Sequence, residues 1–211
     1  MNCGPGRIDD LLLRRRSIRK FKPDDPPGEW IEGMVLCGAR APSPSHSQPV
    51  RFVRVMSAPA KERLRAAMAE GRQRLLQNIA QAGGAKRARN YVTSYFRFSE
   101  FMFDAPVLMC LGTGPHAARD FKGIAELDDP GRRRRDLDIT VGLAAKGYML
   151  KGEDLGLASC ILTAPLLYAS RPEDVLGIEG LDIRCFIVSG WPAEEPAPLE
   201  RKPLSEIYRV L

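Results

Sequence analysis

The sequence predicts an α+β domain in which helices alternate with about four strands. Apolar residues recur at helical spacing over long segments, most clearly over 60–81 and 136–154. Shorter runs at 51–55 and 107–111 have the alternating or continuously apolar patterns of strands. Hydrophobic residues make up 44% of the 211 positions, which suits a folded chain with its own core. We therefore interpret residues 1–211 as one domain.

The first half of the chain is divided by proline and glycine residues. Pro26, Pro27 and Gly28 separate a basic stretch from the next helical pattern, and the prolines of the 42–49 loop end that pattern. Gly83 and Gly84 close the long helix that follows. In chain order, the expected elements are helices at 8–12, 30–39 and 60–81, with a strand at 51–55 before the last of them.

The second half contains two further strands and two further helices. Ser170–Glu173 has the pattern of a capping box with proline in the first turn, and it predicts a short helix through Leu176. Residues 112–135 carry mixed charge without a clear period, and we interpret them as a variable excursion. In chain order, the expected elements are a strand at 107–111, helices at 136–154 and 172–176, and a strand at 183–188.

Composition and net charge limit the kinds of ligand and partner that the chain is expected to bind. The formal net charge is +6, which suits anionic cofactors and substrates but also admits nucleic acid. The five cysteines are odd in number and form no CxxC motif, so they indicate free thiols in a reducing compartment. With two histidines, a zinc site is not expected. No apolar run has the length of a membrane span and no signal peptide is evident, so we expect a cytoplasmic protein without membrane contact.

Two stretches carry most of the candidate binding chemistry. Residues 14–20 combine arginines, a lysine and one serine hydroxyl, a set that suits a phosphate group through charge-assisted hydrogen bonds. The alternative is a solvated basic patch with no binding role. Residues 85–103 interleave basic and aromatic side chains, which fits single-stranded nucleic acid, core packing or the wall of a flat pocket.

Taken together, these stretches resemble the nitroreductase family of flavin enzymes. The resemblance rests on Arg15-Arg16-Ser17-Ile18-Arg19-Lys20-Phe21, on Gly38-Ala39-Arg40-Ala41-Pro42-Ser43 and on His46-Ser47-Gln48-Pro49. Farther along, Leu155-Gly156-Leu157-Ala158-Ser159-Cys160 and Gly190-Trp191-Pro192-Ala193-Glu194-Glu195-Pro196 continue it, and Arg201-Lys202-Pro203-Leu204 completes it. The motifs follow in order over nearly the whole chain. The resemblance implies a three-layer sandwich, with a mixed, mainly antiparallel sheet flanked by helices, in an intertwined homodimer.

The resemblance also implies a binding site for FMN at the subunit interface. The implied phosphate contacts are Arg15, Arg16, Ser17, Arg19 and Arg201, with Lys202 as a second tail candidate. The implied contacts to the ribityl chain and ring are Pro42, Ser43, Pro44, Ser45, His46 and Gln48, with the 43–48 loop supplied by the neighbouring subunit. The implied ring contacts from the other segments are Arg97, Ile161, Leu162 and Thr163. Phe121 is a weaker substrate candidate. Residues 196–211 are expected to form a C-terminal extension, of which Ser205–Leu211 packs on the partner.

The implied chemistry is performed on FMN, so no catalytic side chain and no metal is predicted. Hydride from NADH or NADPH would pass through FMN to a nitroaromatic, a quinone or a similar electron-poor acceptor in a ping-pong cycle. Two alternatives stay open. One keeps the family but changes the chemistry, to reductive dehalogenation or flavin fragmentation. The other is a non-enzymatic basic protein that binds nucleic acid, whose binding would depend steeply on salt.

Overall fold

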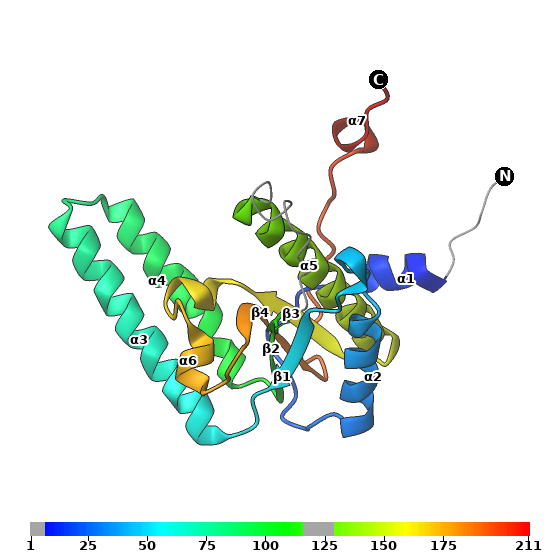
Figure 1. The fold of residues 1–211 in the computed structure, drawn as a ribbon, viewed down its shortest axis with the longest axis horizontal. Helices are drawn as coiled ribbons and strands as arrows, with labels where there is room; N and C mark the ends of the chain where they lie inside the picture. The colour runs from blue at the N-terminus through cyan, green and yellow to red at the C-terminus, as the bar shows by residue number, and fades with distance from the viewer. Residues whose placement is uncertain (1–6, 116–128) are drawn as a thin grey trace, which may run out of the picture.

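The computed structural model describes residues 7–115 and 129–211. The described helices and strands alternate along the chain and place helices on both faces of one sheet (Figure 1). The α-helices are α1 (Arg7–Arg14), α2 (Gly28–Ala39), α3 (Ala58–Gln81), α4 (Lys86–Glu100), α5 (Pro130–Asp154), α6 (Pro172–Leu176) and α7 (Leu204–Ile207). The strands are β1 (Val50–Arg54), β2 (Val107–Thr113), β3 (Ala158–Leu162) and β4 (Asp182–Gly190). Short 3-10 turns lie at 44–46, 101–103 and 164–167.

The four described strands form one antiparallel sheet in the order β1-β2-β4-β3. A single parallel bridge between Ser17 and Ser159 adds the N-terminal segment to the outer edge of β3. The sheet is therefore mainly antiparallel with a short parallel addition, as the resemblance implied. The α+β class and the nitroreductase-like layering are confirmed.

The two faces of the sheet carry separate cores because helices cover both. On one face, Val107, Met109 and Leu111 of β2 pack with α2 and α5. On the other face, Leu108 and Cys110 pack with α3, α4 and α6. Every residue of β2 is buried, which explains why its sequence is continuously apolar instead of alternating.

The boundaries of the 112–135 excursion differ from the prediction. Gly112 and Thr113 belong to β2, and α5 already begins at Pro130, so the arginine run 132–135 is helical. Asp129 is the N-cap of α5 and accepts hydrogen bonds from the backbone N–H groups of Gly131 and Arg132 at 3.0 and 3.1 Å. The helix thus begins at its cap and includes charged first turns, N-terminal to the apolar pattern that predicted a start at residue 136.

The predicted capping box of the short helix is wrong. α6 begins at Pro172 as expected, but its N-cap residue is Arg171, and no side chain caps the helix. Glu173 is buried and forms an ion pair with Arg171 at 3.7 Å, so its carboxylate does not return to the cap backbone. Among the helices of residues 7–115 and 129–211, none is long and apolar enough to cross a membrane.

Candidate functional site

The basic N-terminal segment is an extended strip held between β3 and the stretch after β4. The backbone N–H of Ile18 donates to the Ser159 carbonyl at 3.3 Å. Lys22 N–H donates to the Trp191 carbonyl, and Ala193 N–H donates to the Lys20 carbonyl, both at 2.9 Å. Arg16 and Ile18 line one cavity. Arg19 lines another, and Arg15 and Ser17 act with it on Cys160. Residues 15, 17 and 19 therefore share one side of the strip, and residues 16 and 18 the other.

The first side faces a cavity of about 510 Å³ at the end of β3. Arg19 lines it together with the exposed rings of Tyr95 and Phe98 on α4. Its remaining wall is the stretch 160–164, which includes the predicted residues Ile161, Leu162 and Thr163. Since β3 is an edge strand, backbone groups on its outer side are free to bind a ligand beyond the Ser17 bridge.

Cys160 joins this cavity to the basic strip. Burial raises the pKa of the Cys160 thiol, while the nearby Arg19, Ser17 and Arg15 act in the opposite direction. Its sulfur donates to the Ile161 carbonyl at 3.7 Å. The thiol therefore stays protonated at neutral pH, and we interpret it as part of the cavity wall and not as a nucleophile.

Three cations from distant parts of the chain act on one another electrostatically. Lys146 projects from the middle of α5, and its pKa is lowered by partial burial and then by the positive charges of Arg15 and Arg201. Like charges in such proximity repel one another unless an anion lies among them. The cluster of Arg15, Lys146 and Arg201 is therefore suited to a phosphate, whose oxygens accept charge-assisted hydrogen bonds.

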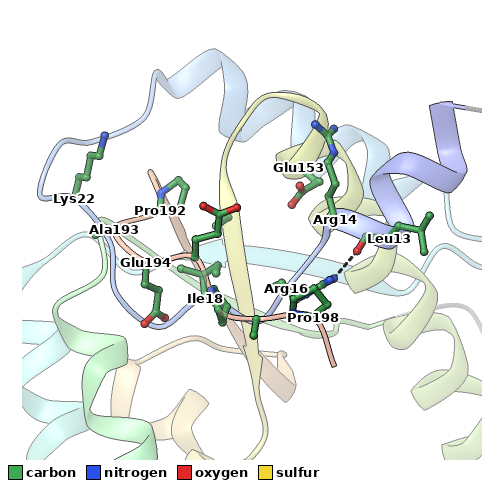
Figure 2. Close-up of a pocket in the computed structure, with 14 residues that line it drawn as sticks. Leu13, Arg14, Arg16, Ile18, Lys22, Glu153, Pro192, Ala193, Glu194 and Pro198 are labelled. Carbon is green, nitrogen blue, oxygen red and sulfur yellow. Dashed lines mark hydrogen bonds between the residues drawn. The ribbon is translucent and has the colours of Figure 1, made fainter. Parts of the chain in front are cut away.

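Arg16, although predicted as a phosphate contact, lies on the opposite side of the strip. Its guanidinium donates to the carbonyls of Leu13 and Arg15 at the C-terminal end of α1. It also lines a second cavity, of about 980 Å³, with Ile18 and the stretch 192–198 (Figure 2). The structure thus brings Arg15, Ser17 and Arg19 together and separates Arg16 from them.

The 42–48 loop lies against α5 and is held by its own hydrogen bonds. Pro42, Ser43 and Pro44 line a small cavity with α5 residues 136–143. Ser43 Oγ accepts from the Gln48 backbone N–H at 2.9 Å, and the Gln48 side-chain amide contacts His46 Nε2 at 2.9 Å. In the described chain, this loop contributes no residue to the cavity that Arg19 lines.

The loop also holds all three positive-φ non-glycine residues of the described chain. Ser45, His46 and Gln48 have φ values of 50°, 55° and 45°. Each such residue costs on the order of 1–2 kcal/mol relative to an ordinary conformation. Strain of this kind is typical of functional segments, because the surrounding structure must stabilise it.

Three further comparisons with the prediction concern single residues. Arg97 is exposed and does not line the cavity at β3, whereas its neighbour Phe98 does. Phe121 lies outside the described residues. Lys202 forms an ion pair with Glu206 at 3.1 Å, so Arg201 is the tail cation left for an anion. Within the ranges 7–115 and 129–211, no three His, Cys, Asp or Glu side chains are grouped as a metal site.

Sequence reasoning missed Lys146, and it included Tyr95 and Phe98 only within the aromatic stretch 85–103, for which the wall of a flat pocket was one interpretation. Lys146 gives a signal, because it interrupts an otherwise small and apolar stretch, 141–147. Tyr95 and Phe98 lie to one side of the buried face of α4 that Val92 and Phe96 form, and only the packing of α4 beside β3 brings them to the cavity. The completed site has a cationic end for an anionic group and a flat, largely apolar slot beside it.

The chain is similar to known proteins in both sequence and fold. The sequence model of the nitroreductase family matches residues 12–191. Human iodotyrosine deiodinase 1 is 24% identical over 209 residues, which cover 94% of this chain and 66% of that protein, so the chain spans just under two thirds of its length. A BluB-like flavoprotein from Clostridium difficile 630 superposes with a TM-score of 0.81 at 22% identity, covering 98% and 99% of the two chains. The FMN-dependent nitroreductase NfnB from Mycobacterium smegmatis, solved with NADPH, superposes with a TM-score of 0.67 at 23% identity, covering 96% and 97%.

Proposed function

The chain belongs to the nitroreductase family, and from this premise we propose that it is an FMN-dependent oxidoreductase that uses NADH or NADPH. Its acceptor is a nitroaromatic, a quinone or a similar electron-poor compound. FMN, when bound, supplies the chemistry by accepting hydride from the nicotinamide and passing electrons to the acceptor. The residues of the chain bind and orient the two reactants in turn.

One observation carries this proposal: the same basic strip contributes Arg15 to the cationic cluster and Arg19 to the slot at β3. Arg15, Lys146 and Arg201 form a set of donors suited to a phosphate dianion. Arg19, Phe98 and the 160–164 stretch border a cavity of about 510 Å³ suited to a flat ring. FMN has a phosphate at one end and an aromatic ring system at the other, so the residues present fit it.

The roles of the residues follow from this fit. Arg15, Lys146 and Arg201 hold the phosphate, with Ser17 beside them in the strip. Arg19 and the outer backbone of β3 near Ile161–Thr163 hold the ring edge. Cations near the ring stabilise negative charge that develops there. The exposed ring of Phe98 limits the thickness of whatever occupies the slot. No proton transfer by a side chain is needed in this proposal.

We further propose that the working unit is a homodimer in which the 43–48 loop completes the site of the neighbouring subunit. In the described chain that loop packs on α5, away from the lining of the cavity at β3. The four described cysteines are free thiols, which fits a cytoplasmic location.

The direct test is a visible absorption spectrum of the purified protein with FMN, then with NADH or NADPH, then with a nitroaromatic. We expect a flavin spectrum that bleaches with a nicotinamide and recovers with the acceptor. A protein that binds no flavin, even in excess, would show that the cationic cluster is an ordinary basic patch.

Reductive dehalogenation of an aromatic ring is a second candidate. The observation in its favour is the match to iodotyrosine deiodinase over 94% of this chain. The two candidates differ in product: iodide is released from an iodinated tyrosine in one case, and a nitro group is reduced in the other. Iodide release in the presence of reduced enzyme, at a rate above nitro reduction, would favour the second candidate.

A further inference from the structure

The carboxylate of Glu194 binds the backbone of the basic strip. The Glu194 Oε1 atom accepts hydrogen bonds from the backbone N–H groups of Arg19 at 2.6 Å and Lys20 at 3.2 Å. These two residues are consecutive, so one oxygen bridges both amides. Hydrogen bonds to an ionised acceptor are shorter and stronger than neutral ones.

Backbone contacts of the two preceding residues fix the position of Glu194 beside the strip. Ala193 N–H donates to the Lys20 carbonyl, and Phe21 forms an antiparallel bridge with Pro192. Glu194 and Ile18 both contribute to the wall of the larger cavity of about 980 Å³, where they are drawn among the lining residues (Figure 2). The carboxylate therefore approaches the strip from the side of Ile18 and not from the side of Ser17.

The position of this carboxylate has an electrostatic consequence. A negative side chain beside a phosphate would weaken phosphate binding through repulsion. Glu194 binds backbone N–H groups and not the guanidinium of Arg19, so it does not neutralise the cation that lines the other cavity. The arrangement fixes the backbone at residue 19 and leaves its side chain available for an anion.

We propose that Glu194 is a positioning residue for the phosphate of the cofactor. It sets the backbone of Arg19 and Lys20 so that Arg15, Ser17 and Arg19 point to the same side. The inference rests on the proposed function, because it needs a bound phosphate. It assigns Glu194 no contact with the cofactor itself.

The test compares FMN with riboflavin, which lacks the phosphate. Dissociation constants for both are measured by flavin fluorescence in the unmodified protein and in Glu194→Ala, Glu194→Gln and Glu195→Ala. Glu195 is the matched control, since it is the exposed neighbour of Glu194 and lines the same cavity. Thermal unfolding of the flavin-free proteins reports any general loss of structure.

The expected result is selective for FMN. Glu194→Ala should weaken FMN binding about tenfold or more, as the loss of hydrogen bonds to a charged acceptor implies. Riboflavin binding should fall much less than FMN binding, because riboflavin lacks the phosphate that Arg15 binds and meets only Arg19 of the strip, at the ring slot. Glu194→Gln keeps an accepting oxygen at the same reach and should stay close to the unmodified protein, as should Glu195→Ala.

Two outcomes would overturn the inference while leaving the proposed function intact. One is an unchanged affinity of Glu194→Ala for FMN, and the other is an equal weakening of FMN and riboflavin. If Glu194→Ala does not fold, Glu194→Asp decides the matter. Its carboxylate keeps the charge but is one methylene shorter, so positioning predicts weaker FMN binding than in the unmodified protein, whereas a role of the charge alone predicts the same FMN affinity. An unmodified protein that binds neither flavin would instead refute the proposed function and this inference with it.

Discussion

Arg15 and Arg16 are adjacent in the chain but have different surroundings. The positive charge of Arg15 acts on Lys146, in the cluster suited to a phosphate. Arg16 donates to the Leu13 and Arg15 carbonyls, and thereby satisfies groups that the end of α1 leaves unpaired. The extended conformation of the strip separates the two roles, because it alternates the direction of successive side chains.

We expect Arg15→Ala and Arg16→Ala to affect different properties. Loss of Arg15 removes a charged hydrogen-bond donor and should weaken FMN binding about tenfold or more. Loss of Arg16 should leave FMN binding within about threefold and lower the free energy of unfolding by about 1 kcal/mol. Fluorescence titration and chemical denaturation of both variants measure the two effects. Equal losses of FMN affinity would place Arg16 in the phosphate site after all.

The stability of the flavin-free protein should depend on pH through Lys146. Partial burial and the charges of Arg15 and Arg201 lower its pKa in the folded protein below the ordinary value of 10.5. Between the lowered pKa and that value, the unfolded chain binds more protons than the folded chain, so stability rises with pH in this window. The flavin-free protein should therefore gain stability from Lys146 as the pH rises through the lowered pKa toward 10.5.

The substitution Lys146→Met should stabilise the flavin-free protein but weaken the binding of FMN. Without flavin, removing one of three like charges should raise the melting temperature at pH 7 and flatten its rise at alkaline pH. With FMN, the same variant should bind the phosphate less tightly, because one cation is missing. Melting curves from pH 7 to about 10, with and without FMN, provide the measurement. A variant that destabilises both states would show that Lys146 contributes through packing.

At the scale of elements, segments with a clear apolar period were predictable and segments without one were not. The strand β2 and the helices α2 and α3 lie where their patterns predicted them. The start of α5 was not predictable from periodicity, because its first turns are exposed and charged. Its Asp129 cap and ion pairs such as Arg135–Asp129 stabilise them instead. The Ser170 capping box failed because Glu173 is engaged by Arg171.

The candidate site was predictable to the extent that it is local. The basic strip is a continuous motif, so its residues could be named as phosphate candidates from the resemblance, and that role stays a prediction. Lys146 and Phe98 come from other helices, and only tertiary packing brings them to the strip and to β3. The orientation of Arg16 depends on the extended backbone between β3 and residue 191, which the sequence pattern does not report.

The contact between α3 and the segment after β3 should be intolerant of added volume. A Cβ atom at Gly71 would lie 1.9 Å from the Tyr168 carbonyl oxygen, so Gly71→Ala must displace α3 or the segment. We expect the free energy of unfolding to fall by about 2–3 kcal/mol. Because Tyr168 closely follows residues 161–164, flavin binding should also weaken.

Gly33→Ala in α2 is the matched control for this prediction. A Cβ atom there meets nothing within 4 Å, so the variant should be neutral or gain up to about 1 kcal/mol through helix propensity. Chemical denaturation of both variants measures the difference. A Gly71→Ala protein as stable as Gly33→Ala would mean that α3 moves freely against the 161–169 segment.

At the scale of the whole molecule, the described chain leaves apolar side chains exposed on several elements at once. The tail is the clearest case, because α7 has no buried residue and the tail extends away from the sheet (Figure 1). Exposed apolar groups that recur on neighbouring elements indicate an interface with another molecule. The exposed apolar residues of α1, α5 and the tail are Ile8, Leu12, Leu13, Ile139, Leu143, Leu199, Leu204, Ile207, Tyr208, Val210 and Leu211.

If a second copy covers this surface and completes the site, subunit association and FMN binding should be lost together. The variant Leu204→Asp with Ile207→Asp places two charges on residues that are 68% and 67% exposed in the single chain, so it should not disturb the folded subunit itself. We expect sedimentation velocity to show monomers and FMN affinity to fall at least about tenfold, because the 43–48 loop of the partner is withdrawn. Met56→Asp is the control, since Met56 is similarly exposed, at 69%, but follows β1 and lies outside these elements. A monomeric double variant that binds FMN with unchanged affinity would show that one chain holds the complete site, and the strained 42–48 loop would then need another explanation.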